Sequence, residues 1–246
     1  MRILLAPIVL VLTLGGALGH ATTLTYGDED CLNQGCYGVN DPTAGATLDG
    51  LAAGVVTLAT NSFAHAFPFN PDAGDFPGTD QIYVGSVQTA AHDGYSVSPQ
   101  RINGPQTFSL DFSSLIPGGQ TLSSLTLGIA ADDFQFPVFG QPFIATVDGS
   151  VNSALTTELN SLNETGPVVQ FFTLGLDPSI DTGSHILTIS INEGGDGGDG
   201  WAVDFLTVGV TTQAGAVPEP SSLGLLAAAL ACMALVAARR RSKTTG

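Results

Sequence analysis

Short runs in which apolar and polar residues alternate recur along residues 51–210, and Gly, Pro, Asp or Asn separates each run from the next. Alternation with a period of two is typical of β-strands that bury one face. The separating residues are those that favour turns. The pattern therefore predicts an all-β domain of about eight short antiparallel strands, and it favours a β-sandwich.

The runs predicted to be strands cover residues 54–60, 62–69, 81–87, 106–112, 122–130, 143–147, 168–174, 185–191 and 201–210. Helical spacing replaces the alternation at Val151, Leu155, Leu159 and Leu162. Thr156, Thr157 and Glu158 fall on the other side, which predicts one short amphipathic helix. By analogy with known folds we expect a jelly-roll topology of the carbohydrate-binding-module type.

The N-terminal residues predict a secretory signal peptide. Arg2 gives a short positive region, Ile3–Leu18 is apolar, and Gly19-His20-Ala21 ends in small residues. We expect cleavage after Ala21 and export by the Sec translocon, with an uncleaved N-terminal anchor as the alternative. Residues 22–50 are polar and rich in Gly, Asp and Asn, and they predict an irregular lead-in to the domain.

Three signals follow the domain in a fixed order. After a linker at 211–217, Pro218-Glu219-Pro220 interrupts regular structure, residues 222–238 carry no charge, and a basic cluster starts at Arg239. The uncharged segment lies at the short end of the roughly 17–25 residues that cross a bilayer as a helix. It predicts a C-terminal transmembrane helix whose basic end stays in the cytoplasm.

Residues 218–246, with Val217 before them, resemble the PEP-CTERM sorting signal of Gram-negative bacteria. The resemblance rests on the sorting motif Val217, Pro218, Glu219 and Pro220, the apolar helix and the terminal arginines. It implies recognition by an exosortase, sorting to the cell surface or extracellular matrix, and a bacterium that also makes an exopolysaccharide.

Charge excludes one class of partner. The sequence has 22 acidic and six basic residues. Residues 22–217 contain 21 of the acids, all except Glu219, but only one base, Arg101, so their formal charge is −20. Such a surface repels nucleic acid and anionic lipid head groups. It suits solubility, divalent cations, or neutral and cationic polymers.

The cysteines predict one local crosslink. Cys31 and Cys36 enclose four residues of an exported loop, and an oxidising compartment favours a disulfide between them. A metal pair is the alternative, although no further Cys or nearby His completes a zinc shell.

The segment 192–201 contains five glycines and three carboxylates between the last two predicted strands. Glu193, Asp196 and Asp199 are oxygen ligands of the type that Ca²⁺ accepts. Asp204 has the parity of apolar residues in the last strand, so we expect it to face inward, partnered by calcium, loop amides or Arg101. A solvated hairpin loop is the alternative to a calcium site.

Two expectations concern ligands and catalysis. Trp201, the single tryptophan, could stack on a sugar ring, with a core role as the alternative. No nucleophile elbow or zinc-protease motif occurs, so we expect no enzyme. We therefore expect a cell-surface or extracellular-matrix protein with a structural or adhesive role associated with exopolysaccharide, and with calcium-dependent glycan binding as a finer expectation. The alternatives are an exported polysaccharide hydrolase and a membrane-tethered periplasmic protein.

Overall fold

The computed structural model describes residues 20–27, 29, 32, 55–60, 75–85, 100–134, 142–162, 168–194, 200–214, 230 and 233. Seven strands form one sheet: β1 (His20–Tyr26), β2 (Val55–Thr60), β3 (Gln81–Val84), β4 (Ile102–Asn103), β6 (Gln120–Asp132), β9 (Val168–Leu176) and β11 (Gly200–Ala214). Four form the other: β5 (Gln106–Asp111), β7 (Phe143–Val147), β8 (Ser150–Val151) and β10 (Ile186–Glu193). The helix α2 spans Ser153–Ser161, and 3₁₀ turns cover Ser113–Leu115 and Pro178–Ile180.

The long strand β11 organises the seven-stranded sheet. From Ala202 to Ala214 it pairs with β6 on one side, while β3 and β1 share its other side, β3 at its start and β1 toward its end. The remaining order runs from β6 through β9 to β2, and β4 follows β3. Among the described strands every pair is antiparallel except β3 with β4.

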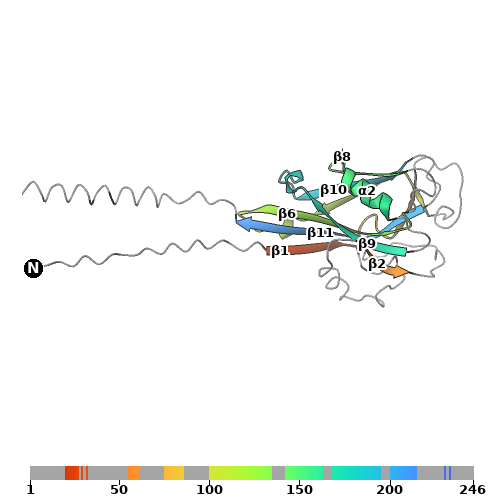
Figure 1. Cartoon of the computed structure of the whole chain (residues 1–246), viewed down its shortest axis with the longest axis horizontal. Coiled ribbons are helices and arrows are strands. Elements are labelled where there is room, and N and C mark those ends of the chain that lie inside the picture. Colours follow the sequence, from red (N-terminus) through yellow and green to blue (C-terminus); the bar gives the residue numbers. More distant parts are fainter. Residues whose placement is uncertain are drawn as a thin grey trace, which may run out of the picture.

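The two sheets pack face to face around one hydrophobic core (Figure 1). Alternate residues of β5, β7 and β10 are buried, as the period of two requires. At one edge the Tyr26 hydroxyl of β1 donates to the Asp111 carbonyl of β5 over 2.7 Å, which joins the sheets. Burial raises the pKa of Tyr26.

The prediction of an all-β domain with one helix is confirmed, and the jelly-roll topology stays a prediction.

The helix α2 covers the open edge of β7. Asn152 caps the helix by accepting from the Leu155 amide over 2.9 Å. The Asn160 side chain accepts from the Phe143 amide (2.8 Å) and donates to the Phe143 carbonyl (2.9 Å). The Thr156 hydroxyl lies within 3.1 Å of the Ala145 amide and 3.4 Å of its carbonyl. Thr156 and Asn160 are four residues apart, about 6 Å along the helix axis, and Phe143 and Ala145 are two residues apart, about 6.6 Å along the strand. The two spacings match, so each helix side chain lies opposite its strand residue.

The predicted helix is confirmed, but Thr156 does not behave as a solvent-facing residue. It is half-buried and bonds to the backbone of β7. The unpaired N–H and C=O groups at a strand edge require hydrogen-bond partners, and a polar helix residue supplies them here.

Predicted strands agree with β2, β3, β5, β6, β7, β9, β10 and β11, and the bounds of β7 match those predicted. Two predictions about the ends of the domain are wrong. The expected irregular lead-in begins with strand β1, because residues 22–26 pair with residues 206–210 of β11. The expected linker at 211–217 is strand as far as Ala214, because residues 211–214 continue the pairing of β11 with β6. The predicted strand 62–69 lies outside the described residues.

In the described part of the chain, no helix is long and apolar enough to cross a membrane. The predicted transmembrane segment 222–238 falls outside the description apart from Leu230 and Met233.

Candidate functional site

The end of the sandwich where β10 passes to β11 carries the residues singled out for calcium. Glu193 ends β10 opposite Phe143 of β7, and β11 starts at Gly200. Residues 195–199 lie outside the described part of the chain, and Asp196 and Asp199 with them.

Five carboxylates are buried in the described residues: Asp80, Asp132, Asp133, Glu193 and Asp204, each at most 4% exposed. The backbone brings three of them, Asp80, Asp132 and Asp204, to the first residues of β11. Asp132 pairs in register with Ala202, and the Asp80 amide donates to the Val203 carbonyl over 2.9 Å. An ionised carboxylate at such depth requires hydrogen-bond or charge partners.

Three members of this set, Asp80, Asp132 and Asp133, were not among the site residues predicted from the sequence. Asp80 and Asp133 both take left-handed φ angles, 52° and 65°. Aspartate tolerates this conformation better than most residues, and each lies at the end of a strand. The sequence signal for Asp80 and Asp133 was an Asp close to the start or end of an apolar run, where a strand begins or ends.

Asp204 is buried, as expected, but the parity argument for it is wrong. A β-bulge lies between Val203 and Leu206, so the residues before it change parity. Trp201 and Val203, before the bulge, and Leu206, after it, all belong to the hydrophobic core between the sheets, whereas Ala202 does not.

The Leu32 amide donates to Asp204 Oδ1 over 2.9 Å. Leu32 is fully buried and has a φ of 57°. A carboxylate on β11 therefore holds a turn of the N-terminal lead-in against the seven-stranded sheet, which is the loop-amide partner considered from the sequence. Cys31 and Cys36, on either side of this turn, lie outside the described residues.

No group of three His, Cys, Asp or Glu side chains that could hold a metal ion occurs within the described ranges. The expected set combines Glu193 and Asp204 with two residues outside those ranges, so calcium binding stays a prediction.

Trp201 is 0% exposed and lies in an aromatic cluster between the sheets. Its ring centroid is 4.9 Å from that of Tyr83, 5.3 Å from Phe134 and 6.0 Å from Phe143. Its indole Nε1 has no hydrogen-bond partner among the described residues. Stacking on a sugar requires an exposed ring face, whereas this ring is covered and packs as a core residue, the alternative weighed above.

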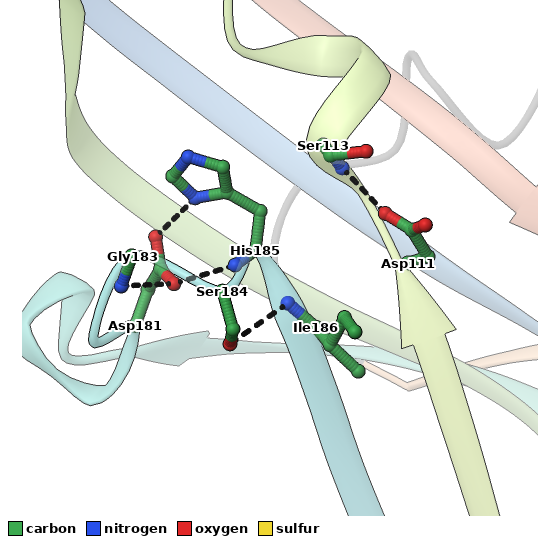
Figure 2. A network of polar contacts seen from close by, with 7 residues as sticks. All are labelled: Asp111, Ser113, Asp181, Gly183, Ser184, His185 and Ile186. Carbon is green, nitrogen blue, oxygen red and sulfur yellow. Dashed lines mark hydrogen bonds and ion pairs between the residues drawn. The ribbon is translucent and has the colours of Figure 1, made fainter.

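A polar network holds the start of β10 (Figure 2). Asp181 Oδ2 lies 2.6 Å from His185 Nδ1, and Asp181 Oδ1 accepts from the amides of Gly183 (3.0 Å) and His185 (2.9 Å). Burial opposes ionisation of Asp181, but these contacts outweigh it and hold the pKa of Asp181 below its usual value.

The same network reaches β5. The Phe112 amide donates to the His185 carbonyl over 2.9 Å, and Asp111 Oδ1 accepts from the Ser113 amide over 3.0 Å. That bond is the first cause that keeps the pKa of Asp111 low. His185 has a φ of 55°, and Asp181 fixes both its backbone and its ring, so the network orders a loop and orients one imidazole.

Comparison with known proteins gives one informative match. The model of the PEP-CTERM protein-sorting motif matches residues 216–241, two residues after the end of β11. No curated protein matches the chain. Among solved structures, the crystal structure of dimeric latent PorU from Porphyromonas gingivalis aligns over 54% of this chain and 12% of that one, at 11% identity and a TM-score of 0.29, and a likeness that low supports no argument.

The residues of the sorting motif, Val217 to Pro220, lie outside the described ranges, so their place in the chain is known from the sequence. The predicted resemblance is confirmed by the match. The chain carries a PEP-CTERM protein-sorting motif in its C-terminal tail, and this motif implies an exported protein with a membrane-anchored sorting signal that an exosortase processes.

Proposed function

We propose that this chain is a cell-surface or extracellular-matrix protein, with a structural or adhesive role in association with the exopolysaccharide of its host. The observation that carries the proposal is the sorting motif at 216–241. The motif selects the destination, and the β-sandwich is the part of the chain that acts there.

The fold supports a domain that can be separated from its tail. The last strand ends at Ala214, before the matched residues begin, so all the described strands lie N-terminal to the motif. Because Thr22 pairs with Val210, the part of the first strand that remains after cleavage at Ala21 lies beside the end of the last strand (Figure 1). Removal of residues from Val217 onward breaks no described strand pair.

Calcium-dependent glycan binding is a finer part of the proposal. It is supported by the carboxylates that flank the 194–199 loop, with Glu193 and Asp204 buried on either side and two acids within the loop. Ca²⁺ accepts irregular sets of carboxylate and backbone oxygens, and a glycine-rich loop supplies both.

Localisation of a tail variant tests the destination. Glu219→Ala changes the motif, and Glu158→Ala, on helix α2, is a matched loss of one acid in the domain. In the native host, the Glu219 variant should stay in the inner-membrane fraction, while wild type and the Glu158 variant reach the surface or the medium. Equal delivery of all three proteins would contradict the proposal, and retention of all three would favour a tethered periplasmic protein.

A further inference from the structure

The solvent-facing side of the four-stranded sheet carries a set of hydroxyl groups. Strand register places Ser190 of β10 between Thr107 of β5 and Thr146 of β7, and places Thr188 opposite Ser109. We call these five residues the hydroxyl face. They alternate with buried residues along each strand, so they share the side turned away from the core.

The hydroxyls of this face make no hydrogen bond to another group in the described part of the chain. The seven-stranded sheet differs in this respect. There Thr126 Oγ1 donates to the Gly209 carbonyl over 3.2 Å, Ser123 Oγ donates to the Thr211 carbonyl over 2.9 Å, and the Thr212 hydroxyl bonds to the Gln120 side chain. The hydroxyl face therefore presents donors and acceptors outward, whereas the other sheet uses several of its own internally.

The centre of the hydroxyl face is uncharged, in a chain with a formal net charge of −16. The nearest acids along its strands stand at their ends. Asp111 pairs with Ile186 at the end of β5, and Asp148 follows β7, where its Oδ1 accepts from the Thr188 amide over 2.8 Å.

Exposed aliphatic side chains border the same sheet. Ile144 is 42% exposed, Ile186 41% and Val151 68%. Hydroxyls spaced about 4.8 Å apart across strands, next to aliphatic groups, offer hydrogen bonds and apolar contact to one extended molecule.

We propose that the hydroxyl face binds a chain of uncharged polysaccharide. Hydroxyl groups of the sugar would pair with Thr107, Ser190 and Thr146 across the sheet, and the sugar C–H faces would lie on the aliphatic border. An acidic polymer would be repelled by the surrounding carboxylates. This inference rests on the proposed association with exopolysaccharide and names the surface that carries it out.

A triple variant tests the face without changing side-chain shape. Thr107→Val, Thr146→Val and Thr188→Val remove three hydroxyls and keep β-branched side chains, which strands favour. The matched control is Thr121→Val, Thr173→Val and Thr211→Val on the seven-stranded sheet, whose positions are likewise exposed or half-exposed.

Affinity electrophoresis would measure the retardation of each protein, purified from its native host, in gels that contain dextran, the host's own exopolysaccharide or acidic alginate. We expect retardation of the wild type by a neutral polymer, at least tenfold weaker affinity in the triple variant, and affinity within twofold of wild type in the control. Light scattering on the same samples would report the oligomeric state.

Three results would overturn the inference. Unchanged affinity in the triple variant would place glycan binding on another surface and leave the proposed function intact. Absence of wild-type binding to every polymer would reject the face, and surface delivery would then be judged by fractionation alone. A changed oligomeric state with unchanged affinity would show that the face joins two copies of the chain.

Discussion

Replacement of Asn160 by alanine should destabilise the domain by removing the cover of a strand edge. The Asn160 side chain makes two hydrogen bonds to the backbone of Phe143 and a third to the Thr156 carbonyl, at 2.8, 2.9 and 2.6 Å. The two bonds to Phe143 tie the last turn of α2 to β7, and in the variant the peptide groups of the buried Phe143 would lose these partners.

The expected loss follows from those two bonds. Each contributes a net stabilisation of about 0.5–1.5 kcal/mol, so the free energy of unfolding should fall by about 2 kcal/mol. In a domain of this size, that change lowers the melting temperature by about 4–8 °C. Urea unfolding at pH 7, followed by circular dichroism, would measure the free energy directly.

Two companion variants sharpen the test. Ser161→Ala lies in the same turn, where its hydroxyl donates to the Glu158 carbonyl at an exposed position, and it should cost only a few tenths of a kcal/mol. Asn160→Asp keeps the acceptor for the Phe143 amide but turns a carboxylate oxygen toward the Phe143 and Thr156 carbonyls, and this repulsion should make it at least as unstable as Asn160→Ala at pH 7. If Asn160→Ala unfolds at the same urea concentration as Ser161→Ala, the edge-capping role of Asn160 is refuted.

Three further outcomes are expected. The carboxyl of Asp181 has a lowered pKa in the folded state, so its contribution to the free energy of unfolding is present above its unfolded pKa and is lost as pH falls through the folded pKa. Asp181→Asn should therefore be less stable than wild type at pH 7. In a pH series of urea unfolding, this difference should shrink below about pH 4. Millimolar calcium should raise the melting temperature of the protein and Asp199→Ala should abolish the rise, so an unchanged wild-type melting temperature would reject a calcium site. Cys31 and Cys36 should resist alkylation until a reductant is added, and free thiols in freshly isolated exported protein would contradict a disulfide.

The sequence predicted elements whose side chains obey a single period. Phe143, Ala145 and Val147 alternate without interruption, and β7 has the predicted bounds. The helix was equally evident, since Leu155 and Leu159 are buried one turn apart.

Other features depend on partners distant in the chain, which a local pattern does not contain. Strand β1 has few apolar residues and forms because it pairs with β11, 180 to 192 positions away in the chain. The bulge after Val203 changes which residues of β11 face the core, and one extra residue leaves no mark on composition. Thr156 was predicted on the polar side of the helix and Asn160 was not singled out, although both side chains bond to backbone groups of β7.

The burial of Trp201 illustrates the same limit for function. An aromatic residue at a loop–strand junction fits both a sugar platform and a core, and only the positions of Phe134 and Phe143 distinguish them. The sorting tail needed no such information, because its residues are contiguous and their order alone is diagnostic.

The C-terminal boundary of the mature protein tests the central claim most directly. Intact-mass and peptide mass spectrometry of the protein from its native host, after membranes are separated from medium, would locate that boundary. A C-terminus near Val217–Ser222 in the surface or medium fraction is the predicted result, because the motif at 216–241 marks the tail for processing. An intact C-terminus at Gly246 in the inner membrane would contradict surface delivery and identify a tethered periplasmic domain instead.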